Sequence, residues 1–126
     1  MNHFDKYGGV KCMTLVIKDF YGAVLKHPKL MHYFSNLSEH ALVTHQIKFT
    51  TFLMGKPSEN HDSHQMKKTH QGRGITEDSF HEMAYVFESI LKKHGVSTDD
   101  CAVILKRLEI FKSDIIEKPH YLRKVV

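Results

Sequence analysis

Apolar residues recur at intervals of three and four in separate stretches of this 126-residue chain, and this spacing constrains the fold more than any other feature. Such a spacing places the apolar side chains on one face of an α-helix. Strand signals are weak, because β-branched runs are short and the chain has no Asn-Gly or Asp-Gly hairpin turn. The sequence therefore predicts an all-α fold of about six helices, each of which must pack on another to bury its apolar face.

Residues that cap or break helices give the expected boundaries. Ser38, Thr76 and Ser97 are suited to cap helix N-termini, and Asp100 completes a capping box with Ser97. Gly95 is suited to end the helix that Thr76 begins. The predicted elements are an opening helix that ends at Tyr7, helices over 11–26, 28–34, 38–54, 63–71 and 76–95, and a last helix from Ser97 to Ile115.

Length and composition indicate one soluble domain over residues 1–126, with a mobile tail over about 117–126. The net charge of +4 is dispersed, which permits attraction to nucleic acid or acidic membranes without indicating either, and we expect no nucleic-acid partner. No apolar segment is long enough to span a bilayer, and the N-terminus has no signal-peptide pattern, so we expect a cytoplasmic protein. Cys12 and Cys101 match no metal or redox spacing.

The stretch MKKTHQGRGIT, residues 66–76, places His70 at the end of a short predicted helix, just before two glycines that stop it. One interpretation is a surface histidine favoured by the helix dipole. Another is a metal ligand, because Met66 and Ile75 indicate an inward face. His61, His64 and His70 could together bind zinc, but the loop offers no carboxylate or cysteine spaced as a clear fourth ligand.

Gln46 is a polar residue within the apolar face that Leu42, Phe49 and Leu53 form on the predicted helix 38–54. A buried amide needs a hydrogen-bond partner, and a neighbouring backbone group is the ordinary one. Tyr21, Phe34 and His45 are each, taken alone, typical core or half-exposed residues. Together with one inward histidine, these residues are what a haem pocket needs: an imidazole for the iron, apolar walls and a few hydrogen-bond donors.

The chain resembles the truncated haemoglobins of group I over nearly its whole length. The resemblance is carried by FDKYGG at 4–9, DFYGAVL at 19–25, HYFSNL at 32–37, HQIKF at 45–49 and MKKTHQGRGIT at 66–76. It implies a two-over-two helical sandwich around haem b, iron protoporphyrin IX.

The resemblance also implies roles for individual residues. His70 corresponds to the proximal ligand of the haem iron, and Tyr21 and Gln46 to a distal pair that hydrogen-bonds the bound gas. His45 matches a position from which some members supply a second iron ligand. The other residues that would line the haem cavity are Phe34, Leu42, Phe49, Met66, Ile75, Phe80 and Met83.

By the same resemblance, the expected function is binding of oxygen, nitric oxide and carbon monoxide to ferrous iron, in a monomer or weak dimer. Nitric oxide dioxygenase or weak peroxidase activity would require a reductase that the sequence does not identify. Two alternatives remain open at this point: a haem-free all-α interaction module and a haem-based gas or redox sensor.

Overall fold

The computed structural model describes residues 2–34, 38–56, 66, 70 and 73–116, and this part of the chain contains helices and no strand. Its elements are α1 (His3–Lys6), α2 (Gly9–Leu25), the 3-10 helix η1 (Met31–Tyr33), α3 (Glu39–Leu53), α5 (Glu77–Lys93), α6 (Thr98–Ile110) and α7 (Lys112–Ile115). The predicted all-α fold is confirmed. Within the described residues no helix is both long and apolar enough to cross a membrane.

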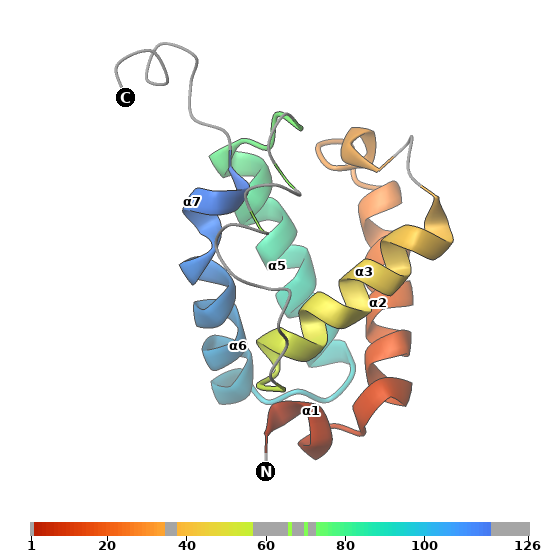
Figure 1. Ribbon diagram of the computed structural model, residues 1–126, viewed down its shortest axis with the longest axis vertical. Helices are drawn as coiled ribbons and strands as arrows, with labels where there is room; N and C mark the ends of the chain where they lie inside the picture. Colours follow the sequence, from red (N-terminus) through yellow and green to blue (C-terminus); the bar gives the residue numbers. More distant parts are fainter. Residues whose placement is uncertain (1, 35–37, 57–65, 67–69, 71–72, 117–126) are drawn as a thin grey trace.

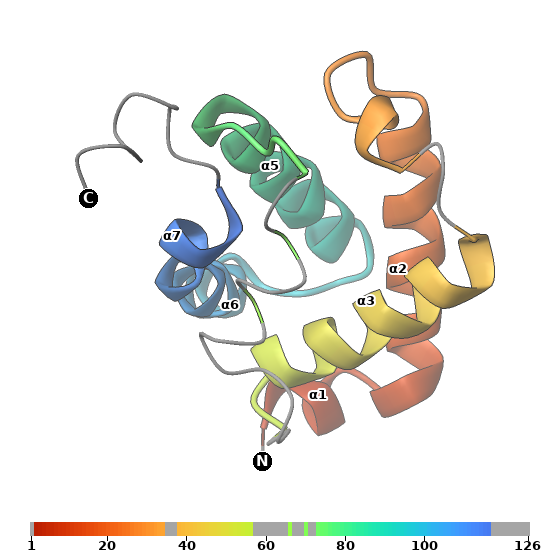
Figure 2. The ribbon, with the colours of Figure 1, turned by 45° about the horizontal axis from the view of Figure 1, so that its top comes forward.

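Four long helices form two packed pairs. In Figure 1, α3 crosses α2 on one side of the molecule, and α5 and α6 lie side by side on the other. The view in Figure 2 shows the same two pairs, with α7 above α6. Contacts of α2 with α5 and of α3 with α6 join the pairs. This arrangement leaves an interior space between the pairs, and the candidate site lies there.

The predicted helix caps are confirmed. The side-chain oxygens of Ser38, Thr76 and Ser97 each accept a hydrogen bond from a backbone N–H three residues later, at 3.4, 3.1 and 3.1 Å. Gly95 follows α5 with a φ of +90°, a conformation that glycine adopts without strain. These local signals therefore fix where α3, α5 and α6 begin.

Two predicted helices are shorter than expected. Pro28 does not begin a helix, because the backbone N–H groups of Leu30 and Met31 both bond the carbonyl of His27 in a turn, and only Met31–Tyr33 is helical. The last helix breaks at Phe111, where a separate turn, α7, begins. This break allows Phe111 and Ile115 to pack in a second cluster of buried side chains.

Two further predictions fall largely outside the described residues. Of the helix predicted over 63–71, only Met66 and His70 are described, and both have helical backbone. The predicted mobile tail over about 117–126 lies wholly outside the described part.

Two clusters of buried side chains stabilise the fold. The main cluster joins α1, α2, α3, α5 and α6, with Met13, Val16, Val24, Leu91 and Ile104 fully buried at its centre. The second cluster lies near α7 and contains Met66, Ile75, Phe80, Phe111 and Ile115. Phe49 and Phe52 of α3 pack on both clusters, so α3 links them.

Asp100 connects the N-terminal segment to α6. Its carboxylate accepts hydrogen bonds from Lys6 at 2.7 Å and from the Tyr7 hydroxyl, and it lies 3.1 Å from His3.

The capping box predicted between Ser97 and Asp100 is only half formed. Ser97 accepts from the backbone of Asp100, but the Ser97 N–H donates to the Tyr7 hydroxyl rather than to the Asp100 side chain.

The contribution of Asp100 to stability should disappear in acid. The hydrogen bond from Lys6, and next that from Tyr7, hold the pKa of Asp100 well below its ordinary value of 3.8. As pH falls the unfolded chain takes up this proton first, so the stabilisation is complete above pH 3.8 and is lost below it. We expect Asp100→Asn to lower the urea midpoint near neutral pH, and the difference from wild type to shrink in more acidic buffers.

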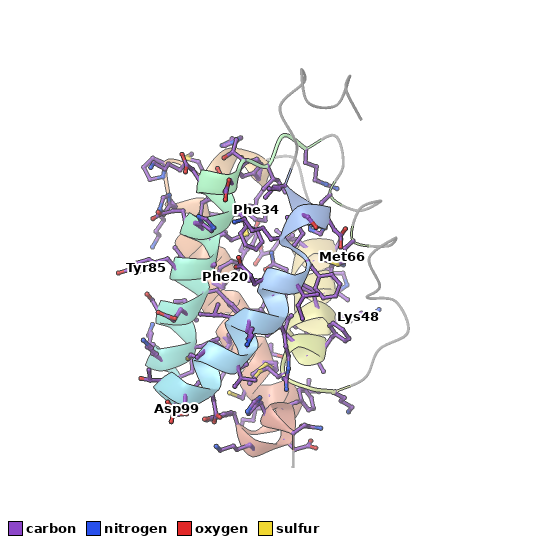
Figure 3. All side chains as sticks on the ribbon, turned by 90° about the vertical axis from the view of Figure 1, so that its left-hand side faces the viewer. Phe20, Phe34, Lys48, Met66, Tyr85 and Asp99 are labelled. Carbon is purple, nitrogen blue, oxygen red and sulfur yellow. The ribbon has the colours of Figure 1, made fainter. Side chains whose placement is uncertain are left out.

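Asp99→Asn is the matched control, because it removes the same charge from the same first turn of α6. Asp99 is exposed and lies at the outer end of the helix in Figure 3. An equal loss of stability in both variants would contradict a specific role for the Asp100 cluster.

Candidate functional site

A cavity of ≈ 170 Å³ lies between the two helix pairs. Its walls are mainly aliphatic and aromatic side chains, and few polar groups reach it. Figure 3 shows Phe20 and Phe34 in the interior, between the surrounding helices. The lining residues are Ile17, Phe20, Tyr33, Phe34, Leu42, His45, Gln46, Phe49, Thr50, Leu53, His70, Arg73, Ile75, Phe80, Met83, Ala84, Phe87, Leu108 and Ile115.

His70 reaches this cavity from the segment between α3 and α5. Its Nδ1 lies 2.8 Å from the carbonyl oxygen of Met66, one helical turn earlier. Because a carbonyl can only accept, Nδ1 carries the proton, and in the neutral ring Nε2 keeps its lone pair. No hydrogen bond to Nε2 is formed within the described residues. An imidazole with one nitrogen bonded to a carbonyl and the other available is the usual form of a metal-binding histidine.

The surroundings of His70 favour its neutral form. Burial lowers the pKa of His70 below its ordinary value of 6.5. The bond to Met66 opposes this change, and positive charge on His45 and Arg73 adds to it. The uncharged ring, which is the form that binds metals, is therefore the stable one near neutral pH.

Gln46 brings a polar atom to the cavity without a partner. It lines the cavity from α3, on the same face as Leu42, Phe49 and Leu53. Its Oε1 is buried and has no hydrogen-bond partner within the described residues. The oxygen and nitrogen of an amide exchange places by a half-turn, so the side chain can present either an acceptor or a donor there. An unpartnered buried amide costs free energy unless something else in the cavity bonds it.

One edge of the cavity is basic. His45 and Arg73 line it, and the exposed Lys48, which is not among the lining residues, follows His45 by three residues on α3. Burial lowers the pKa of His45 first of all, and the positive charges of Arg73 and Lys48 lower it further. The positive charges of Arg73 and Lys48 repel each other near His45, and an anionic group of a ligand would stabilise them.

Most of the residues predicted for the site meet at this cavity. Those that line it are Phe34, Leu42, His45, Gln46, Phe49, His70, Ile75, Phe80 and Met83. Tyr21 and Met66 are not among the lining residues. Tyr21 is half-buried against the main cluster, and Met66 is buried in the second cluster, where its carbonyl holds His70.

The zinc interpretation of His70 has no support from the described residues. His61 and His64 lie outside them. The described part holds no group of three or more His, Cys, Asp or Glu side chains placed to bind a metal ion.

Sequence reasoning missed several lining residues, among them Tyr33, Arg73, Leu108 and Ile115. Tyr33 precedes Phe34 in the stretch HYFSNL, and Arg73 stands between the two glycines that follow His70. Both therefore lie beside residues that were predicted, and proximity in sequence could have indicated them. Leu108 and Ile115 carry no such signal, because their faces are decided by how α6 and α7 pack.

Comparison with known proteins decides the family. The model of the family described as bacterial-like globin matches residues 2–117. The group 1 truncated hemoglobin GlbN of Mycolicibacterium paratuberculosis is 30% identical over 102 residues, which cover 81% of this chain and 74% of that protein. The chain is a truncated haemoglobin of the bacterial-like globin family. Membership of the globins implies a haem-based, gas-binding protein.

Solved structures support the fold of this truncated haemoglobin. Truncated hemoglobin from Tetrahymena pyriformis in the Fe(III) form superposes with a TM-score of 0.83 at 24% identity, over 94% of this chain and 100% of that one. The 2/2 hemoglobin of Synechococcus sp. PCC 7002, in the cyanomet state with covalently attached heme, gives 0.83 at 23% identity over the same shares. The predicted two-over-two sandwich is confirmed.

Proposed function

We propose that this truncated haemoglobin binds haem b through His70 and uses it to bind oxygen, nitric oxide or carbon monoxide. The observation that carries the proposal is His70 itself, a neutral imidazole whose Nδ1 is bonded to Met66 and whose ring lines a mainly apolar cavity. Neutral imidazole is the proximal ligand in the globins.

The described residues fit this cofactor in three respects. The apolar walls suit a porphyrin, and Phe34 and Phe80 supply aromatic surface for its faces. Arg73 lines the cavity, and Lys48 lies near enough to lower the pKa of His45, so both supply positive charge close to the wall, where the two carboxylates of haem b would be stabilised. Gln46 supplies a buried polar atom that otherwise has no partner in the described structure.

Haem supplies an iron atom that binds a diatomic gas and can change its oxidation state. Gln46 would donate an amide N–H toward the gas, and the hydroxyl of Tyr21 would be a second donor. Tyr21 is half-buried on α2, one residue after the lining residue Phe20, so the proposed role requires its side chain to turn toward the cavity. Each such hydrogen bond should slow release of a partly charged ligand, because it raises the free-energy barrier to dissociation by on the order of 1–2 kcal/mol.

His45 is the candidate for a second iron ligand when no gas is bound. It lines the cavity next to Gln46, and burial favours its neutral, ligating form. A ligand held by the protein itself would reduce the fraction of molecules open to the gas and slow binding in proportion. We expect His45→Ala to convert a low-spin ferrous spectrum to a high-spin one and to speed binding of carbon monoxide. An unaltered spectrum would remove His45 from this role.

Conversion of nitric oxide and oxygen to nitrate is the activity we propose beyond ligand binding. With haem bound, this conversion would leave the iron oxidised by one electron, and a separate reductase would have to return that electron after each turnover. Weak peroxidase activity and a role as a gas or redox sensor are the alternative functions that we propose for the same site.

The visible absorption spectrum of the reduced, haem-loaded protein tests the proposal directly. We expect a ferrous spectrum that shifts to a carbonyl form when carbon monoxide is added. A single broad band before the gas would indicate His70 alone as the protein ligand, and sharp split bands would indicate His45 as well. Failure of the protein to take up haem would overturn the proposal and favour the haem-free interaction module.

A further inference from the structure

Tyr33 joins two walls of the cavity that lie far apart in the sequence. Its ring lines the cavity as the last residue of η1, next to the buried Phe34. Its hydroxyl lies 3.2 Å from the carbonyl oxygen of Gly74 and 3.0 Å from the hydroxyl oxygen of Ser79. Gly74 follows His70 by four residues, and Ser79 lies in the first turn of α5.

The hydroxyl groups form a chain with one direction. A carbonyl can only accept, so the single proton of Tyr33 is donated to Gly74. The hydroxyl of Ser79 is then free to donate to the oxygen of Tyr33. The hydroxyl of Thr76 lies 3.0 Å from Ser79 Oγ and completes the chain, while its oxygen accepts the Ser79 N–H at 3.1 Å. Every proton in the chain has an acceptor, and Ser79 is buried, so the network is well defined.

Gly74, which accepts the hydrogen bond of Tyr33, has open space around its own backbone. Gly74 has a φ of +70°, and a Cβ atom added there would meet no atom within 4 Å. The backbone bond between the Arg73 N–H and the His70 carbonyl is long, at 3.4 Å. The hydroxyl of Tyr33 therefore links η1 to Gly74, which stands between two residues of the cavity wall, Arg73 and Ile75.

We propose that Tyr33 is a positioning residue for His70. By fixing Gly74 against η1, it constrains the backbone four residues after His70 and so the orientation of the imidazole. The Nδ1 bond to Met66 holds the same turn from the other side. This inference rests on the proposed role of His70 as the iron ligand, and it adds a hydrogen-bonded link between that ligand and the Phe34 wall.

The test compares Tyr33→Phe with the native tyrosine in haem-loaded protein that carries His45→Ala, so that no second protein ligand hides the iron–histidine band. Phenylalanine keeps the ring in the cavity wall and removes only the hydroxyl. We expect a shift of the iron–histidine stretching band in the ferrous, gas-free protein, which reports the ligand bond itself. We also expect roughly 2- to 10-fold faster transfer of haem to an acceptor protein, from the loss of one hydrogen bond.

Tyr85→Phe is the matched control, because Tyr85 is 67% exposed and points away from the molecule in Figure 3. It should leave both readouts unchanged. Ser79→Ala is the second variant; it removes the donor to Tyr33, leaves the Gly74 bond and the Thr76 cap in place, and should shift the band in the same direction by less.

The outcomes separate this inference from the proposed function. If the reference protein, which carries His45→Ala alone, took up haem and showed no iron–histidine band, both would be overturned. A normal band in the reference protein that Tyr33→Phe and Ser79→Ala leave unmoved would overturn only the positioning role, even if these variants unfold at lower temperature. A shift of equal size in Tyr85→Phe would also overturn it. Should Tyr33→Phe fail to fold, the position of the iron–histidine band in Ser79→Ala tests the positioning role alone.

Discussion

Replacing His70 with glycine is expected to abolish stable haem binding. Exchange of a residue that merely orients a metal ligand typically lowers metal affinity 10- to 100-fold, so loss of the ligand itself should cost at least about 100-fold. The measurement is the amount of haem retained per protein after gel filtration, with the rate of haem transfer to an acceptor protein. Added imidazole should restore part of the binding, because it can occupy the space that the side chain leaves.

His81→Gly provides the control, since His81 is an exposed histidine on α5. It should retain haem, whereas a general effect of removing a histidine would weaken both proteins. If His70→Gly retained haem with the wild-type spectrum and no response to imidazole, His70 would not be the ligand. His45, which also lines the cavity, would then be the next candidate.

Replacing Gln46 with leucine is expected to change ligand release and stability in opposite directions. Loss of an amide donor should speed oxygen dissociation from the ferrous protein roughly tenfold, because one charge-assisted hydrogen bond is lost. Leucine of similar size also removes a buried polar atom that has no partner in the described structure. In denaturant, the gas-free protein should therefore gain about 1–3 kcal/mol in free energy of unfolding.

Tyr21→Phe tests the second proposed donor in the same assay. It should also speed oxygen dissociation several-fold, but without the gain in stability, since the Tyr21 hydroxyl is not among the buried unpartnered atoms. Tyr85→Phe again serves as the control at an exposed tyrosine. Faster release in Gln46→Leu combined with an unchanged rate in Tyr21→Phe would leave Gln46 as the sole donor, as the cavity lining suggests.

Local chemistry explains why much of the fold could be predicted. Hydroxyl caps at Ser38, Thr76 and Ser97 bond atoms only three residues away, so their effect needs no tertiary contact. The apolar faces of the long helices likewise depend only on the helical period. The break at Phe111 could not be predicted this way, because it depends on how that ring packs with Met66 and Phe80 in the second cluster.

Some features of the candidate site could likewise be predicted from the sequence, and others could not. The sequence by itself determined that His70 lies in a helical turn, that Gln46 lies on an apolar face, and that the fold is all-α, since each follows from spacing along one element. Only the tertiary structure decided that Tyr33 bonds Gly74, 41 residues away, and that Tyr21 packs outside the lining of the cavity. Such contacts depend on the angles at which separate helices cross, and side-chain packing across the whole interior sets those angles.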